Sequence, residues 1–225
     1  MKPAAHHPRR IDRRALLTLG AAGVGGWAVG RVLARSAPVG RDVRASGAVA
    51  EILDDPRAPA TGSAAASLRM AVFSDYRCPA CRHGYAALTA AVARDGDVRM
   101  LFKDWPIFGA PSQRAARVAL GAARQGIYPR LHHMLMTEAG PLDTAHLRKA
   151  VAAAGGDWTR VVADLAAHAA EIDAQLARHA AEAASIALPG TPGYLAGSLL
   201  AVGAIDAAAF ARLFAAARRA GSVGV

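Results

Sequence analysis

Cysteine is scarce in this chain: Cys78 and Cys81 are the only two among 225 residues. Two cysteines do not fill a structural zinc site, which normally needs four thiolate or imidazole ligands. The other candidate pair is His132 and His133, but neighbours on an expected helix point to different faces. The sequence also has no Met-rich or Cys/His-rich tract. We therefore assign no residue as a metal ligand and expect no cofactor.

Excess positive charge is lacking from most of the chain. The formal net charge is +10, but residues 1–44 hold nine Lys/Arg against two acidic residues. The remaining 181 residues are nearly balanced, with 18 Lys/Arg against 15 acidic residues. A basic surface that binds nucleic acid is therefore not indicated, and we expect no nucleic-acid partner.

The N-terminal region lacks an apolar run long enough to span a membrane. Residues 15–30 are uncharged and glycine-rich, but they are fewer than the roughly 20 residues that a spanning helix needs. Arg13 and Arg14 precede this stretch, and Ala34 and Ser36 supply small residues for cleavage. The pattern is typical of a twin-arginine export signal, with a retained inner-membrane anchor as the alternative. Either way we expect the globular part in the periplasm or another extracytoplasmic compartment, where disulfides persist.

The two cysteines lie between an expected strand and an expected helix. Apolar residues at 68–73 predict a short buried strand, and the spacing at 82–94 predicts an amphipathic helix. Cys78 and Cys81 can form a disulfide within one helical turn, and the helix N-terminus favours a thiolate on the first sulfur. Spacing alone leaves open half a zinc site, a soft-metal site or a small structural disulfide. The strand-then-helix setting favours redox chemistry at an exposed pair of cysteines.

Strand patterns are absent from the middle of the chain. A second strand at 98–102 follows the cysteine-bearing helix and predicts a parallel βαβ unit. From Lys103 onward, roughly eighty residues predict only helices. Strand patterns return at 193–196 and 199–202, and Asp206 is expected to cap a final helix. The predicted order is βαβ, a helical block and then ββα. This is an α/β thioredoxin fold with an all-helical insertion.

These patterns predict a division of the chain into four parts. They are an export signal at 1–36, a lead-in with a short helix at 37–67, a thioredoxin-fold domain at 68–103 and 189–220, and an inserted helical domain at 104–188. Within the insertion, Ser112 and Thr144 are expected at helix N-caps, and Asp157 is expected to open the last long helical run.

Four landmarks occur in order along the exported part. They are D-P-R-A-P at 55–59, F-S-D-Y-R-C-P-A-C at 73–81, D-W-P-I-F-G at 104–109 and G-T-P at 190–192. With them, residues 48–219 resemble the DsbA-like thiol:disulfide oxidoreductases, in particular the exported bacterial branch. The order and spread of the landmarks are far more specific than two cysteines three residues apart.

The resemblance implies a role for each residue near the cysteines. Cys78 is the attacking thiolate and Cys81 the resolving thiol, with Pro79 and Ala80 supporting them from between. The pair Thr191 and Pro192 is implied to form a cis-proline loop that faces the cysteines and binds substrate. The implied partners are exported proteins that contain cysteine and a membrane redox partner that resets the pair. The alternative is a soft-metal protein that binds Cu(I) or Zn on the same fold.

Two positions depart from the family pattern. Strongly oxidising members have Cys-Pro-His-Cys, whereas this chain has Cys-Pro-Ala-Cys, so the direction of disulfide exchange stays open. Many relatives also carry a buried Glu six residues before the first cysteine, where this chain has Val72. A charged group at that depth could come instead from Lys103 or Asp75, although Asp75 is expected to be solvated in its turn.

Overall fold

A six-stranded sheet forms the centre of residues 39–222, the part of the chain that the computed structural model describes. The export signal predicted for residues 1–36 lies outside this part. The strand order is β1-β6-β5-β3-β4-β2. The strands are β1 (Arg41–Asp42), β2 (Ala60–Thr61), β3 (Leu68–Ser74), β4 (Val98–Asp104), β5 (Gly193–Ala196) and β6 (Leu199–Val202). Strands β3 and β4 are parallel and the other pairs are antiparallel, which confirms the predicted βαβ unit and the C-terminal hairpin.

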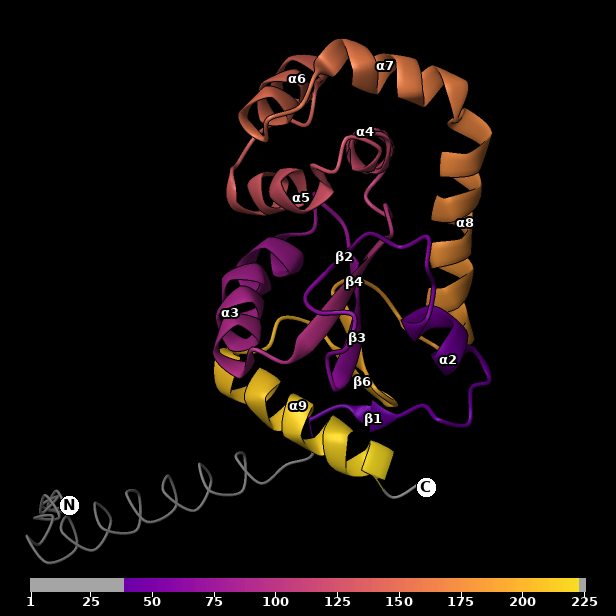
Figure 1. The fold of residues 1–225 in the computed structure, drawn as a ribbon, viewed down its shortest axis with the longest axis vertical. Helices are drawn as coiled ribbons and strands as arrows, with labels where there is room; N and C mark the ends of the chain where they lie inside the picture. The colour runs from indigo at the N-terminus through magenta and orange to yellow at the C-terminus, as the bar shows by residue number, and fades with distance from the viewer. Residues whose placement is uncertain (1–38, 223–225) are drawn as a thin grey trace, which may run out of the picture. The chain divides into compact units, whose positions relative to one another are not determined.

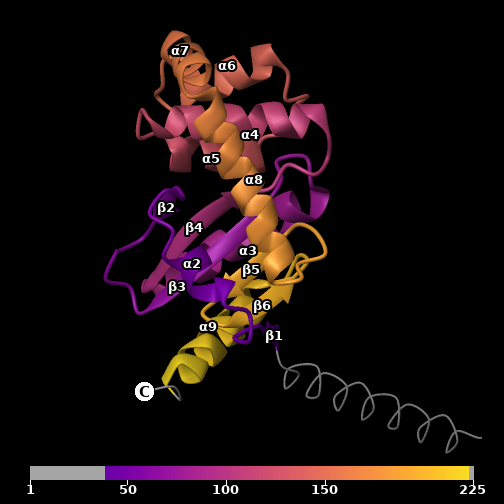
Figure 2. The same ribbon diagram turned by 90° about the vertical axis from the view of Figure 1, so that its right-hand side faces the viewer.

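Helices cover both faces of this sheet and extend beyond one end of it (Figure 1). They are α2 (Ala48–Leu53), α3 (Pro79–Asp95), α4 (Ala110–Ala123), α5 (Tyr128–Thr137), α6 (Thr144–Ala153), α7 (Trp158–Ala167), α8 (Ala169–Ser185) and α9 (Ala207–Ser222). Helices α3 and α9 lie on one face, and α2 with the C-terminal half of α8 lies on the other. Figure 2 shows α4 to α7 gathered at the end of the sheet, from which α8 runs back along it.

The central strand β3 is buried on both faces because helices cover each side. Met70 and Val72 belong to the core that includes α3 and α9, whereas Ala71 and Phe73 belong to a smaller core with α2 and the end of α8. Alternate side chains of a strand point to opposite faces, which explains this division. It also explains why the strand reads as an almost continuous apolar run.

Strand β4 continues two residues beyond the predicted end, to Asp104. The extension carries two polar side chains that are fully buried, Lys103 on one face and Asp104 on the other. The sequence pattern ended the strand at the last apolar residue, Phe102, because buried charge is not expected in a strand. Both side chains find hydrogen-bond partners on helices, Lys103 with Glu182 of α8 and Asp104 with Tyr128 of α5, which lets the strand continue.

The ammonium group of Lys103, on β4, binds the lead-in segment to the sheet. Its Nζ lies 2.9 Å from Asp55 Oδ2 and 2.8 Å from Glu182 Oε2 at the end of α8. Burial by itself would raise the pKa of Asp55, but the hydrogen bond from Lys103 and the backbone N–H of Arg57 lower it to about 2. This ionic cluster joins Asp55 to Lys103, 48 positions later in the sequence, and to Glu182, 127 positions later.

Two predicted helix caps are wrong and two are confirmed, one of them Asp206, whose carboxylate accepts from the N–H of Ala209 at the start of α9. Gly109, with φ 84°, precedes α4, and Ser112 lies inside that helix with its side chain buried. Asp143 rather than Thr144 caps α6, because its carboxylate accepts from the N–H of His146. Asp157 caps α7 as predicted. Between residues 39 and 222, no helix is both long enough and apolar enough to cross a membrane.

Candidate active site

Cys78 occupies the N-cap position of α3, at the end of the turn that follows β3. Its Sγ accepts a hydrogen bond from the N–H of Cys81 (3.3 Å) and donates one to the carbonyl oxygen of Thr191 (3.3 Å). The free N–H groups at a helix N-terminus stabilise negative charge on such a sulfur. Both cysteines are free thiols. The geometry suits a thiol that cycles between free and disulfide-bonded states.

The two thiols are far less accessible than the sequence predicted. Cys78 is 2% exposed and Cys81 is 3% exposed, so the expectation that the two cysteines are exposed is wrong. The loop at Thr191 lies against Cys78, since the Thr191 carbonyl oxygen accepts the hydrogen bond of its thiol. The neighbouring Arg77 and Pro79 are exposed. Substrate therefore has to approach over this rim.

The structure brings together all the residues that the resemblance assigned to the site. The Thr191–Pro192 peptide bond is cis, and the loop that contains it lies against Cys78 through the Thr191 carbonyl group. Pro192 is buried, and Thr191 is partly buried. Ala80, between the cysteines, packs against the core that contains them. Burial raises the pKa of the Cys81 thiol well above its usual range.

Asp75 organises the turn before the cysteines, and the expectation that it is solvated is wrong. It is 1% exposed, and its carboxylate accepts hydrogen bonds from the N–H groups of Arg77, Ile107 and Phe108 and from Ser112 Oγ, at 2.6 to 3.0 Å. The donors belong to the cysteine turn, to the loop after β4 and to the first turn of α4. A carboxylate in this position satisfies N–H groups that the change of direction leaves without backbone partners.

Neither Val72 nor Lys103 supplies a charge beneath the cysteines. Val72 is 3% exposed and belongs to the same core as both cysteines, with Phe102 and Tyr194 as its cross-strand neighbours. Lys103 points to the opposite face, where it binds Asp55 and Glu182. The suggestion that Lys103 replaces the missing acidic residue is therefore wrong.

A buried polar cluster, which sequence reasoning missed, lies beside the cysteine turn. It consists of Tyr76, Asp104, Tyr128 and His132. Tyr128 donates to Asp104 Oδ2 (2.9 Å), and the hydroxyl group of Tyr76 lies 3.0 Å from His132 Nδ1. Burial lowers the pKa of His132 to about 3. The only hint in the sequence was the D-W-P motif, and α5 otherwise looks like an ordinary amphipathic helix.

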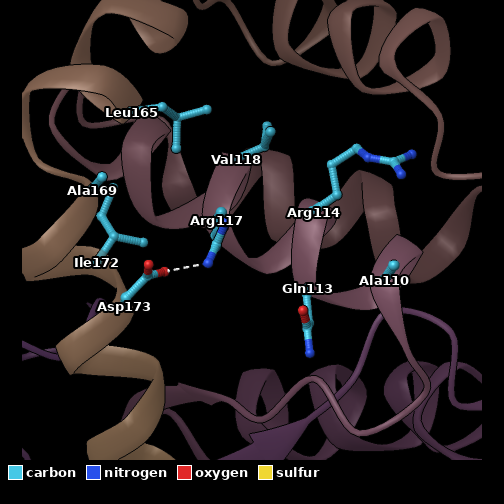
Figure 3. A pocket seen from close by; sticks show the side chains of 9 residues that line it. All are labelled: Ala110, Gln113, Arg114, Arg117, Val118, Leu165, Ala169, Ile172 and Asp173. Carbon is cyan, nitrogen blue, oxygen red and sulfur yellow. Dashed lines mark ion pairs between the residues drawn. The ribbon is translucent and has the colours of Figure 1, made fainter.

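A separate hollow lies away from the cysteines, between α4 and the α7–α8 corner (Figure 3). Its volume is about 410 Å³, and Val118, Leu165 and Ile172 give it an apolar lining. An ion pair between Arg117 and Asp173 (2.8 Å) crosses one side of it. None of the residues that the sequence assigned to the site lines this hollow. Among residues 39–222, no group of three or more His, Cys, Asp or Glu side chains could hold a metal ion.

A comparison with known protein families identifies the family of this chain. The model of the DSBA-like thioredoxin domain matches residues 69–215. The chain belongs to this family. The match runs from β3 to α9 and includes both cysteines and the cis-proline loop. The predicted thioredoxin fold of this DsbA-like chain, with helices between its two halves, is confirmed.

Solved structures agree with this assignment of the DsbA-like chain. A thioredoxin-like oxidoreductase from Silicibacter pomeroyi DSS-3 is 31% identical, with a TM-score of 0.70 over 77% of this chain and 97% of that one. The thiol-disulfide exchange protein α-DsbA2 from Wolbachia pipientis is 24% identical, with a TM-score of 0.71 over 76% of this chain and 92% of that one. The second likeness concerns the fold alone.

Curated relatives of the DsbA-like chain include much longer proteins. A protein named Na(+)/H(+) antiporter NhaA 1, from Mycolicibacterium gilvum (strain PYR-GCK), is 26% identical over 224 residues. The alignment covers 96% of this chain and 35% of the antiporter. The chain thus spans about a third of the length of the curated relatives that it matches.

Proposed function

We propose that this protein exchanges disulfides with exported, cysteine-containing proteins through Cys78 and Cys81. The observation that carries the proposal is the position of the Cys78 sulfur, at the N-cap of α3 and against the Thr191 carbonyl group. The N–H of Cys81 can stabilise negative charge on it. The burial of Cys81 suits a resolving thiol, which reacts with the disulfide at Cys78 and does not need to meet substrate directly.

In the oxidising direction, a substrate thiolate attacks Cys78 Sγ and breaks the Cys78–Cys81 bond. Cys81 leaves with the electron pair and takes up a proton, and Cys78 stays joined to the substrate. A second substrate thiolate then attacks the substrate sulfur of this mixed disulfide and releases Cys78 as a thiolate. The substrate loses two electrons and gains a disulfide, and the cysteine pair gains two electrons. In the reverse direction Cys78 attacks a substrate disulfide and Cys81 resolves the intermediate.

The cis-proline loop is proposed to hold the substrate chain beside Cys78. Pro79 and Ala80 form the start of α3 between the cysteines, and the Thr191 carbonyl group, next to the cis bond to Pro192, contacts Cys78. Ile107 and Phe108 are each 44% exposed, and Arg77 joins them to the rim through its hydrogen bond to the Phe108 carbonyl oxygen (3.3 Å). Apolar side chains at this rim suit unfolded substrate, whose apolar residues are accessible.

The setting of this activity is proposed to be the periplasm or another extracytoplasmic compartment. The export pattern at residues 1–36 supports it, and a structural neighbour from Salmonella enterica serovar Typhimurium is described as periplasmic. A membrane redox partner would reset the pair after each cycle. We also propose that residues 104–188 act as an inserted helical domain, and that residues 68–103 and 189–220 form the catalytic one.

Two matched serine variants test the roles of the cysteines. Cys78→Ser is expected to abolish oxidation of a dithiol peptide, because the attacked sulfur is gone. Cys81→Ser, given instead a disulfide that joins two separate peptides, is expected to accumulate a mixed disulfide visible by mass spectrometry, because the Cys78 thiolate displaces one peptide as a thiolate and no Cys81 thiol resolves the product. Mixed disulfide in the Cys78→Ser protein and none in the Cys81→Ser protein would reverse the assignment. Stoichiometric Cu(I) or Zn in the purified protein, with no exchange activity, would support the soft-metal alternative.

A further inference from the structure

Asp104 places a carboxyl group next to the start of the cysteine turn. It is the last residue of β4 and lies opposite Ser74, the last residue of β3. The next residue along from Ser74 is Asp75, whose carbonyl oxygen accepts the N–H of Cys78 (3.1 Å). Asp104 is 1% exposed. A fully buried acid therefore lies within a few residues of the reacting sulfur, on the cysteine side of the sheet.

The two neighbouring carboxyl groups are supplied very unequally with hydrogen-bond donors. Asp75 accepts four, which stabilise a carboxylate. Asp104 accepts one from Tyr128 (2.9 Å) and has a longer contact with the Tyr76 hydroxyl group, and its Oδ1 has no hydrogen-bond partner among residues 39–222. Two carboxylates so close together in a buried site repel each other. The Asp104 carboxylate is therefore the less stabilised of the two, so Asp104 is the one that can take up a proton.

The groups that face Asp104 from the elements around it supply no positive charge. Lys103 points to the opposite face. From α5, Tyr128 is neutral and His132 is kept neutral by burial, and Tyr76 in the cysteine turn is also a phenol. From α8, His179 Nδ1 meets only the backbone carbonyl oxygen of Asp104 (3.1 Å). Burial and, less strongly, the charge of Asp75 raise the pKa of Asp104 to about 7.

We propose that Asp104 is a positioning residue for disulfide exchange, whose buried carboxyl group takes up a proton when the cysteine pair is reduced and loses it when the pair is oxidised. The proposal rests on the proposed function. The negative charge of the Cys78 thiolate and that of an ionised Asp104 disfavour each other, and such a coupling is reciprocal.

The atoms and charges of the coupled step balance. A substrate with two thiols gives two electrons and two protons to the oxidised pair. One proton ends on Cys81, Cys78 is left as a thiolate, and the other proton goes to the Asp104 carboxylate. When the pair is oxidised again, the thiolate charge disappears and Asp104 returns its proton to solvent. Near neutral pH the exchange equilibrium then depends on the protonation of Asp104.

The test is the rate of alkylation of Cys78 by iodoacetamide between pH 5 and 9. The Cys81→Ser background leaves one thiol, and its profile is expected to show two inflections, from the thiol and from Asp104. Asp104→Asn in this background should leave one inflection and speed alkylation above pH 7 by about three- to tenfold, as expected for the removal of a buried negative charge nearby. Tyr128→Phe removes the donor to Asp104, so the inflection of the acid should move to higher pH.

Asp173→Asn serves as the matched control, because Asp173 is an exposed acid on α8 and its loss should leave the profile unchanged. An Asp104→Asn profile equal to that of its parent would overturn the proposal. Should that variant fail to fold in a thermal melt, Tyr128→Phe decides by itself, since an unmoved inflection contradicts the proposal equally. Failure of the proposed function would look different: the wild-type protein would not oxidise a dithiol peptide at any pH.

Discussion

Gly84 lies one helical turn after Cys81, where α3 packs on the sheet. A Cβ atom at this position would lie 3.0 Å from the hydroxyl oxygen of Tyr194 and 3.5 Å from Ala204. Tyr194 cannot easily retreat, because its ring packs edge-on against Phe210 with the centroids 4.8 Å apart. The glycine is therefore required by the close approach of the phenol, and not by its own backbone conformation.

We expect Gly84→Ala to destabilise the protein by about 1 kcal/mol, since overpacking costs more than the gain in helix propensity returns. Tyr194→Phe removes the hydroxyl oxygen and frees the space. In that background Gly84→Ala should become neutral or stabilising. Urea unfolding of the four proteins gives the coupling between the two positions. Equal costs of Gly84→Ala in both backgrounds would show that the hydroxyl group does not limit the packing.

At the level of elements, the loop between β4 and α4 is held to the cysteine turn by one carboxylate. Asp75 receives the N–H groups of Ile107 and Phe108 from that loop and the hydroxyl group of Ser112 from α4. The helical part and the catalytic turn are thus positioned by the same side chain. Removing it leaves several polar groups without a partner inside the protein.

Asp75→Ala is expected to lower the free energy of unfolding by about 3 kcal/mol or more, because each buried polar group left unsatisfied costs about 1–3 kcal/mol. Ser112→Ala removes one donor and leaves three, so its cost should be about 1 kcal/mol. Urea unfolding measures both. Asp75→Ala should also slow dithiol oxidation, because the turn that carries Cys78 loses its support. Similar small costs for both variants would contradict the central role of Asp75.

At the scale of the whole molecule, buried titratable groups make stability depend on pH. Burial lowers the pKa of His132 and His179 to about 3, so the unfolded chain binds protons at both histidines first as pH falls below the ordinary value near 6.5. Asp104, with its pKa raised to about 7 by burial, acts in the opposite sense. Between about pH 4 and 6.5 the unfolded chain binds two more protons at the histidines than the folded protein does, and one fewer at Asp104. The net difference is one proton.

The free energy of unfolding should therefore fall by about 1.4 kcal/mol per pH unit as pH is lowered from 6.5 to 4. His132→Gln removes one of the two histidine contributions and should make this fall shallower. Asp104→Asn removes the opposing contribution and should make it steeper. Urea unfolding at half-unit steps of pH measures the slopes. Parallel curves for all three proteins would show that these groups do not set the pH dependence.

Local sequence patterns were sufficient to predict the order of the main elements and to single out the cysteine pair. Alternating and helical spacings depend on local geometry, so they located the strand before the cysteines, the helix after them and the C-terminal hairpin. Cys78, Cys81 and the Gly190–Thr191–Pro192 motif were found by spacing and resemblance alone. Local signals were weaker for helix caps, and Ser112 shows why: its hydroxyl group donates to Asp75, 37 positions away, instead of capping its own helix.

Tertiary packing sets which polar side chains are buried and on which face of the sheet each one finds its partners. Asp75, Lys103 and Asp104 lie within one strand end and one turn, yet Lys103 binds two carboxylates on one face and Asp104 meets Tyr128 on the other. Burial depends on how the layers pack. The sequence around a charged residue does not show which distant residue will become its hydrogen-bond partner. The burial of Asp104 therefore depends on the packing of β4 against α5 and could not be read from the sequence.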